Sequence, residues 1–272
     1  MLFAIGMGIG LLLGLTGAGG SVFAVPLLVM LAGLPMPEAV GISLGAVAAS
    51  TLYGSLSNGK NGRILWLPGM VLAMSGALTA PLGKYLGTLV PELWLTLGFS
   101  LLAGVIALRM GWQARHQPEH SRIVRGASFA QVSAPSLVCK LSSTGQFELK
   151  PRCLSRLVLG GAGVGVLSGL FGVGGGFLIV PLLIALSGVT IAQAVSTSLL
   201  IITLISGSGF VSHLLLSPHL PWAHLAWVTA GGVLGMFAGQ HLSKKLAGPR
   251  LQQLFALGLM LMAIFFVVWR LL

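Results

Sequence analysis

The sequence predicts an all-α polytopic membrane protein made of two homologous repeats, and three observations support this fold class. The chain has 272 residues, of which 56% are hydrophobic and only 7% are charged, whereas about a quarter of the residues of a soluble domain are charged. Its two halves are similar in sequence, and each contains several apolar segments long enough to cross a bilayer. This composition excludes a soluble enzyme, a disulfide-rich secreted domain and, despite a net charge of +11, a nucleic-acid-binding protein.

The charged residues divide the chain into parts. More than half of them fall between Arg109 and Arg156, in a stretch that also contains prolines and a run of small polar residues. Lys and Arg collect in cytoplasmic loops, so we expect this stretch to be a basic cytoplasmic linker. The expected units are an N-terminal transmembrane repeat, residues 1–112; the polar linker, residues 113–153; and a C-terminal transmembrane repeat, residues 154–272.

The two halves repeat each other closely. Residues 8–26 align without a gap with residues 163–181, and the match continues through Ser43 and Ser198. Bias in composition explains far less identity than this, so the sequence indicates an internal duplication. Internal repeats are the common construction of secondary transporters, which bind their substrate near the bilayer midplane at the interface between the repeats.

Each repeat is expected to contain four hydrophobic segments. The opening segment of each is too long for one plain span and contains a cluster of glycines. It is therefore either one tilted, discontinuous helix or two half-helices that fold back as a re-entrant hairpin. The expected segments are 2–33, 39–57, 64–88 and 92–112 in the first repeat, and 157–187, 192–213, 221–243 and 251–270 in the second.

The distribution of basic residues favours inverted repeats. A re-entrant opening segment leaves three crossings per repeat and inverts the second repeat, whereas a single crossing leaves four and keeps the repeats parallel. With the linker in the cytoplasm, Lys60 and Arg63 are cytoplasmic in either case. Inversion also places Lys244, Lys245 and Arg250 in the cytoplasm, which agrees better with the preference of Lys and Arg for that side.

The glycine clusters are the expected substrate site. Backbone that is not helical is tolerated inside a bilayer only where it is buried in protein or lines a watery cavity. A half-helix that starts after such an interruption points free N–H groups and a partial positive charge at the cavity, which suits an anion. The alternative is close helix packing through small residues. The clusters are Gly17, Ala18, Gly19, Gly20 and Ser21 in the first repeat, and Gly172, Val173, Gly174, Gly175 and Gly176 in the second.

Close packing is instead the expected role of the regularly spaced glycines that precede each cluster. Glycines four residues apart share one face of a helix and let two backbones approach each other. These glycines are Gly6, Gly10 and Gly14 in the first repeat, and Gly161, Gly165 and Gly169 in the second.

A few polar side chains are expected to complete the site. Ser43 and Ser198 occupy matching positions, and their hydroxyls either solvate an anion or bond their own helix. Lys84 and its partner in the repeat, Gln240, could line an anion path, or Lys84 could snorkel to the membrane surface. His213 and His241 are candidates for proton coupling, the alternative being an interfacial position.

The sequence contains no catalytic constellation, metal-ligand pattern or cofactor motif. Its four carboxylates lie near the expected loops or span edges and form no acid–base pair. Cys139 and Cys153 lie in or next to the linker, far from any CxxC pattern, and are expected as free thiols in a reducing compartment. We therefore do not expect an enzyme.

The motif GLFGVGGGFLIVPLL at residues 169–183, with the weaker copy GLTGAGGSVFAVPLL at residues 14–28, resembles the TauE/SafE family, also called the toluene-sulfonate uptake permease family. The resemblance covers both apolar halves. It implies a multi-pass inner-membrane carrier of sulfite or sulfur-containing organic anions. In the first copy, Ala18 and Ser21 replace Val173 and Gly176, which leaves it open whether both halves bind equally.

The predicted function is thus secondary transport of a small sulfur oxyanion or organosulfonate, with H⁺ or Na⁺ as the possible coupling ion. A passive anion channel and a carrier for another small organic anion are the alternatives. A membrane scaffold or enzyme without a transport role is a third reading. The sequence leaves the direction, the exact substrate and the oligomeric state open.

Overall fold

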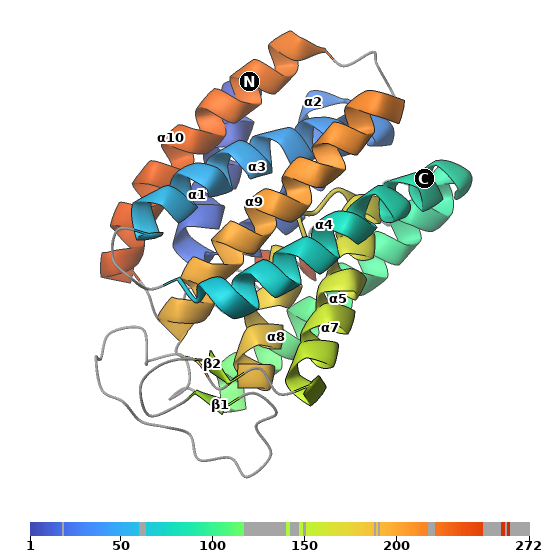
Figure 1. The fold of residues 1–272 in the computed structure, drawn as a ribbon. Helices are drawn as coiled ribbons and strands as arrows, with labels where there is room; N and C mark the ends of the chain where they lie inside the picture. Colours follow the sequence, from blue (N-terminus) through green and yellow to red (C-terminus); the bar gives the residue numbers. More distant parts are fainter. Residues whose placement is uncertain are drawn as a thin grey trace.

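The computed structural model shows a bundle of packed helices (Figure 1). Most of the expected segment 251–270 and most of the expected linker lie outside the residues that the structure describes. The described residues are 1–17, 19–59, 64–116, 140–141, 147–148, 151–187, 189, 191–216, 221–246, 257–258 and 260–261.

The first repeat contains α1 (Leu2–Thr16), the short 3₁₀ helix η1 (Gly19–Phe23), α2 (Ala24–Ala32), α3 (Met36–Gly59), α4 (Trp66–Leu89) and α5 (Glu92–His116). The second contains α7 (Pro151–Phe171), α8 (Gly176–Ser187), α9 (Ile191–Leu216) and α10 (Trp222–Leu246). Between them, β1 (Lys140–Leu141) pairs antiparallel with β2 (Phe147–Glu148). Helices α1 to α4 of the first half are matched in the same order by α7 to α10 of the second, whereas η1 and α5 have no counterpart among the described residues. Helix α7 begins inside the stretch expected as linker.

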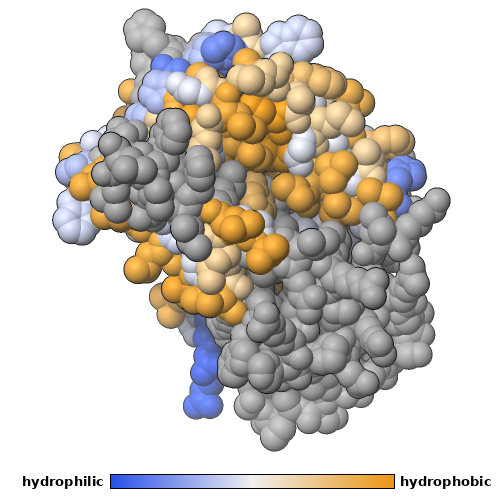
Figure 2. All heavy atoms as spheres, turned by 180° about the vertical axis from the view of Figure 1, so that it is seen from behind, coloured by the Kyte–Doolittle hydropathy of each residue, from blue (hydrophilic) through white to orange (hydrophobic). Residues whose placement is uncertain are grey.

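The helices have the length and surface of a membrane protein. Within the described residues, four are long and apolar enough to cross a bilayer: Met36–Gly59, Trp66–Leu89, Pro151–Phe171 and Gln193–Leu216. Large apolar side chains such as Leu78, Leu101 and Leu215 are more than 70% exposed, as expected for side chains that face lipid. In Figure 2, apolar residues cover the middle of the described surface and hydrophilic residues gather near its margins. The prediction of a helical multi-pass membrane protein is confirmed.

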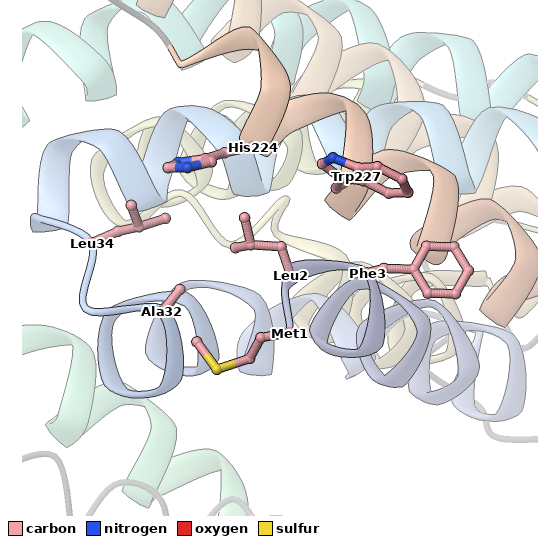
Figure 3. Close-up of a pocket in the computed structure, with 7 residues that line it drawn as sticks. All are labelled: Met1, Leu2, Phe3, Ala32, Leu34, His224 and Trp227. Atoms are coloured by element: carbon pink, nitrogen blue, oxygen red, sulfur yellow. The ribbon is translucent and has the colours of Figure 1, made fainter.

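Both opening segments fold back on themselves. Helix α1 is only about 22 Å long at 1.5 Å per residue, and α2 is shorter still, so neither spans the roughly 30 Å hydrocarbon core. The start of α1 and the residues at the end of α2, Ala32 and Leu34, line the same cavity of about 480 Å³ (Figure 3). In the second repeat, Leu182 of α8 packs against Gly160 of α7. The chain thus turns back after the glycine cluster in both halves. Helix α7 is nevertheless long enough to cross a bilayer, so the re-entrant hairpin stays a prediction.

The regularly spaced glycines bring helices of different repeats into backbone contact. A Cβ atom added to Gly10 of α1 would collide with the carbonyl of Gly232 in α10, and one added to Gly165 of α7 would collide with the carbonyl of Gly76 in α4. Residue numbers rise together along each pair, so α1 runs parallel to α10, and α7 runs parallel to α4. The predicted close packing of these glycines is confirmed. The same contact recurs at Gly6, Gly14, Gly161 and Gly169.

The middle helices of the two repeats, α3 and α9, lie side by side (Figure 1). Leu44 of α3 lies against Gly209 of α9, while Leu199 of α9 lies against Gly54 of α3. Residue numbers therefore rise along one helix as they fall along the other, which makes the pair antiparallel. Between these two contacts, the Thr203 hydroxyl donates a hydrogen bond of 3.0 Å to the Thr51 hydroxyl.

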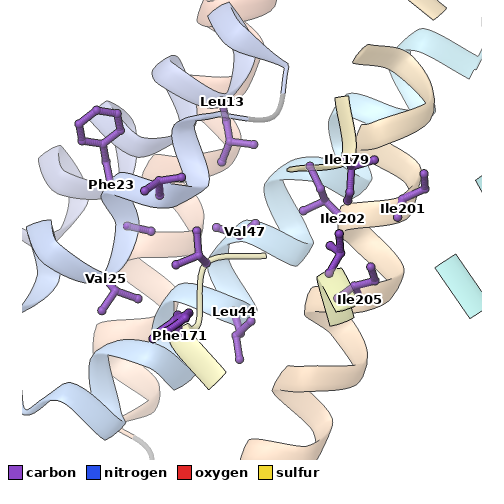
Figure 4. Close-up of a cluster of buried hydrophobic side chains, with 14 of the residues drawn as sticks. Leu13, Phe23, Val25, Leu44, Val47, Phe171, Ile179, Ile201, Ile202 and Ile205 are labelled. Atoms are coloured by element: carbon purple, nitrogen blue, oxygen red, sulfur yellow. The ribbon is translucent and has the colours of Figure 1, made fainter. Parts of the chain in front are cut away.

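A buried apolar cluster joins both repeats around these helices (Figure 4). Its fully buried members include Leu44 and Val47 from the first repeat and Ile179, Ile202 and Ile205 from the second. Because both repeats contribute to it, we do not expect either repeat to form a core without the other.

Cys153 departs from the sequence expectation. It is completely buried and disulfide-bonded, whereas a free thiol was expected. Disulfides persist mainly in oxidising compartments, so this bond counts against the cytoplasmic placement of the linker, which the basic residues favour. That placement stays a prediction.

Candidate functional site

The second glycine cluster forms a non-helical turn between α7 and α8. Gly172, Gly174 and Gly175 have φ angles of +69°, +69° and +64°, in the left-handed region that only glycine adopts without strain. Helix α7 ends where the Gly172 N–H donates to the Ser168 carbonyl at 2.8 Å, and α8 begins at Gly176. We call residues 172–175 the second break.

The first cluster is different, although its glycines match those of the second. Only Gly17 has a positive φ, +76°, and residues 19–23 form the 3₁₀ helix η1. The Thr16 hydroxyl accepts a hydrogen bond of 3.2 Å from the Gly20 N–H, which holds this turn tight. The matching residue in the second repeat is Phe171, which has no such acceptor. We call Gly17 and residues 19–23 the first break; Ala18 lies outside the described residues.

Ser43 and Ser198 each reach the break of the other repeat. The Ser43 hydroxyl donates to the Gly172 carbonyl at 2.9 Å, and the Ser198 hydroxyl lies 3.5 Å from the Gly17 carbonyl and 2.8 Å from the Val195 carbonyl. Both serines are completely buried. The structure thus brings the predicted serines to the breaks, but their hydrogens are directed at backbone carbonyls.

Two further hydroxyls beside the second break have no partner. Ser168 Oγ and Ser206 Oγ are buried without a hydrogen bond in the described part of the chain. Ser206 Oγ lies 2.8 Å from the position that a Cβ would take at Gly174, and the Ser168 side chain lies 3.5 Å from that position at Gly175. Buried hydroxyls are usually paired. At the first break the matching positions carry Leu13 and Thr51, whose hydroxyl bonds its own helix.

Two valines cover the breaks, and the sequence analysis did not single them out. Val40 of α3 packs on Gly172, and Val195 of α9 packs on Gly17. The signal was present, because the two valines align in the repeat. Gly172, Val173, Gly174, Gly175 and Gly176 are all buried, as are Gly17, Gly20 and Ser21. The structure is therefore closed around both breaks.

Lys84 and Gln240 hold matching backbone positions in different surroundings. The Lys84 N–H approaches Gly169, as the Gln240 N–H approaches Gly14. Lys84 is only 6% exposed, pairs with no carboxylate or carbonyl among the described residues, and lines a cavity of about 270 Å³. Gln240 instead donates a hydrogen bond of 3.2 Å from Nε2 to the Gly54 carbonyl.

The two candidate histidines are not equivalent. His213 is 2% exposed, its ring packs against Gly41, and its Nδ1 has no partner in the described part of the chain. His241 is exposed and stacks on Phe237, with ring centroids 4.5 Å apart. The structure brings His213, but not His241, towards the site.

Comparison with known proteins agrees with this architecture. The family model described as "Sulfite exporter TauE/SafE" matches residues 2–266. The chain belongs to the TauE/SafE family. It is therefore a membrane transporter and not an enzyme.

Relatives of this TauE/SafE protein are bacterial. It is 31% identical to a "Probable membrane transporter protein" of Xylella fastidiosa, over 99% of this chain and 95% of the relative. It is 28% identical to the "Probable membrane transporter protein YdhB" of Bacillus subtilis, over 85% and 84% of the two chains. A probable membrane transporter protein of Haemophilus influenzae is 29% identical over 87% of this chain and 83% of its own. No solved structure matches the chain.

Proposed function

We propose that this protein is a secondary carrier of small sulfur-containing anions, sulfite or short organosulfonates, in a bacterial inner membrane. The observation that carries the proposal is the pair of unpaired buried hydroxyls, Ser168 and Ser206, beside the left-handed glycines of the second break. Hydroxyls and free N–H groups at a helix start are donors that an oxyanion accepts. The family description supports the class of substrate.

In this proposal the second break is the main binding element. The anion accepts hydrogen bonds from Ser206, from Ser168 and from N–H groups at the start of α8. Its negative charge is stabilised by the partial positive charge of that helix terminus. The first break, with its tight 3₁₀ turn and paired hydroxyls, completes the site from the other repeat and binds more weakly.

We propose further that the repeats are inverted, with residues 1–112 and 154–272 as the two transmembrane units. Matching helices that pack antiparallel, as α3 and α9 do, are related by an axis perpendicular to their length, which lies in the membrane plane for helices that cross it. If each repeat is a re-entrant hairpin followed by three crossings, the odd number of crossings gives the second repeat the opposite orientation in the membrane. Such repeats support alternating access by rocking around a fixed site.

The closed breaks then correspond to one step of the transport cycle. Helix α3 holds the second break through Ser43 and Val40, and α9 holds the first through Ser198 and Val195. Movement of α3 away from α7 and α8 would uncover the second break and free the Ser43 hydroxyl to donate to the anion. His213 is the residue that we propose for proton coupling, because it is buried beside this path.

A flux experiment tests the proposal. Purified protein in proteoliposomes should accumulate sulfite, thiosulfate or a short sulfonate when a proton or sodium gradient is imposed. Ser206→Ala should lower the rate about tenfold or more, since one hydrogen bond to a charged partner contributes roughly 1.5–3 kcal/mol. Ser212→Ala is the control, because that hydroxyl bonds only to the Ser208 carbonyl of its own helix.

The outcomes separate the alternatives. Flux of sulfur anions that never runs uphill under any gradient would identify a passive channel. Transport of carboxylates with no transport of sulfur anions would identify a carrier for another organic anion. Unchanged flux in Ser206→Ala would remove the proposed role of the second break.

A further inference from the structure

The cavity beside Lys84 lies at the end of the molecule where α3 begins and α4 ends. It has a volume of about 270 Å³, and its walls include Met36 and Val40 of α3, Lys84 and Thr88 of α4, and Leu170 of α7. Pockets for small molecules begin at about 300 Å³, so this space suits a ligand of only a few atoms. We refer to it as the Lys84 cavity.

Lys84 is the charged group of this cavity. Its side chain is only 6% exposed. In the described part of the chain, it forms no hydrogen bond or ion pair. Glu38, in the first turn of α3, forms no ion pair with it. Ionisable groups within membrane spans usually act on a substrate or ion path.

The start of α3 adds to the positive character of the cavity. Helix α3 is 24 residues long, and the cavity lies at its N-terminus, where the helix dipole favours an anion. No described carboxylate side chain forms an ion pair with Lys84, so an anion from outside the chain is the partner that we expect.

The Lys84 cavity adjoins the second break. Val40 lines the cavity and also packs on Gly172, and Leu170, two residues before Gly172, forms another part of its wall. An anion held by Lys84 would therefore need only the displacement of Val40 to reach the second break.

The other repeat lacks this arrangement. Gln240 stands in the position of Lys84, and its side-chain amide donates a hydrogen bond to the Gly54 carbonyl. Asn58 stands in the position that matches His213. The Lys84 cavity thus belongs to one end of the molecule and is not repeated in the other half.

We infer that the Lys84 cavity is an anion-binding subsite that holds a small oxyanion next to the second break before the anion enters the transport site. The inference rests on the proposed transport of anions for its role, and on the unpaired Lys84 for its chemistry. The predicted topology places this end of the molecule on the outer side of the membrane.

Thermal unfolding of the purified protein, with sodium sulfate as the probe and sodium chloride at equal ionic strength as the reference, tests the subsite. Wild-type Tm should rise saturably with sulfate, by roughly 5 °C at about 100-fold excess over the dissociation constant. Lys84→Met should raise Tm without sulfate, because it removes a buried unpaired charge, and should abolish the saturable rise. Lys84→Arg should keep the rise.

Two more variants make the result specific. Gly87→Leu fills the cavity while keeping Lys84, and a Cβ there meets its nearest neighbour, the Leu170 carbonyl oxygen, at an acceptable 3.4 Å; this variant should weaken sulfate binding about ten- to hundred-fold. Arg156→Gln removes the same charge from an exposed position of α7 and should bind sulfate like the wild type.

A saturable rise that survives in both Lys84→Met and Gly87→Leu would overturn the inference, as would the absence of any saturable rise in the wild type. Because the measurement requires no transport, it is independent of the flux experiment. If no sulfur anion is transported but Lys84-dependent sulfate binding persists, the proposed function fails and the subsite stands. If the protein transports sulfur anions normally but shows no Lys84-dependent sulfate binding, the subsite fails and the proposed function stands.

Discussion

At the scale of single residues, matching positions of the two repeats form different hydrogen bonds. Ser43 donates one short hydrogen bond to Gly172, whereas Ser198 divides its donor between Val195 and a more distant Gly17. Ser206 has no partner, whereas the matching Thr51 bonds its own helix. Matching residues of the two halves therefore differ in their hydrogen bonding.

Ser43→Ala should destabilise the protein more than Ser198→Ala does. The first change leaves the buried Gly172 carbonyl without its donor, which costs about 1–3 kcal/mol, while the second mainly removes a bond within one turn of α9. Thermal unfolding monitored by gel filtration in detergent measures both, with Ser212→Ala as the control. Equal Tm values for Ser43→Ala and Ser198→Ala would contradict the difference in hydrogen bonding.

Gly175→Val should abolish transport. Its φ of +64° is strained for a β-branched residue by about 1–3 kcal/mol, and the added side chain would collide with Val164. Gly163→Val is the matched control, since a Cβ at Gly163 has open space around it. Flux is compared per amount of monodisperse protein, so that poor folding is separated from loss of transport. Wild-type flux in Gly175→Val would rule out a substrate site at the second break.

The candidate residues were found from sequence where their types and positions were unusual for a membrane span. Glycine clusters, a lysine inside a span and serines matched between repeats all stand out in an apolar chain. The direction of each hydroxyl does not, because Ser43 and Ser206 are the same residue type in similar helices. Only the fold shows that one is paired and the other is not.

At the scale of elements, parallel helix pairs join the repeats. Helix α1 packs on α10 and α7 packs on α4 through glycines that leave no room for a side chain. Each hairpin is thereby attached to the other repeat, and α3 and α9 cross between the two pairs. Rocking of α1 with α10 against α7 with α4 would preserve these backbone contacts and break those of the serines.

Gly10→Ala should lower stability, and Gly8→Ala should not. The methyl group added to Gly10 would collide with the Gly232 carbonyl, whereas Gly8 has nothing within 4 Å of the new Cβ. Overpacking costs about 1–3 kcal/mol, while Ala in place of Gly favours a helix by about 1 kcal/mol. The same contrast is expected between Gly165→Ala and Gly163→Ala. Thermal unfolding decides, and equal loss of stability at Gly8 and Gly10 would contradict the packing of α1 on α10.

Sequence reasoning distinguished these packing glycines from the clusters by their four-residue spacing, and the structure confirms the packing. It identified the first cluster as a weaker copy of the second but did not predict how their backbones differ. Gly19 and Gly20 match Gly174 and Gly175, yet only the second pair is left-handed. The conformation of the first break depends on the Thr16 hydroxyl, a local hydrogen bond that glycine spacing does not reveal.

At the scale of the whole molecule, the most consequential prediction is the orientation of the protein in the membrane. The basic residues place the linker in the cytoplasm, while the Cys153 disulfide favours an oxidising compartment. The relative orientation of the repeats is a separate question, and antiparallel packing of α3 and α9 supports inversion.

Single cysteines at Lys60 and Ser217, one added per variant, answer both questions. A membrane-impermeant thiol reagent added to intact cells should label Ser217→Cys and not Lys60→Cys, because the loops after α3 and α9 lie on opposite sides of inverted repeats. The parent chain is the control for background labelling. Identical behaviour of the two variants would indicate parallel repeats. Labelling of Lys60→Cys alone would keep inversion and move the linker outside.

The fold class, the duplication and the approximate positions of nearly all described helices follow from apolar segments and their spacing. The exchange of contacts between repeats could not be predicted, because it depends on long-range packing of α1 on α10 and α7 on α4. Whether the opening segments are re-entrant was one of two open alternatives and stays a prediction. Helices α1 and α2, with 15 and 9 residues, are too short to span the bilayer, whereas α7, with 21 residues, is long enough.

In the proposed carrier, Lys84 lies near one mouth and Gln240 near the other, so the two mouths differ chemically. Such a difference cannot change the final distribution of solute, which the driving gradients alone determine. It does change how readily each mouth fills at a given concentration. Half-saturation should therefore occur at a lower anion concentration on the lysine side, so that the protein collects scarce solute from that side and discharges it easily on the other.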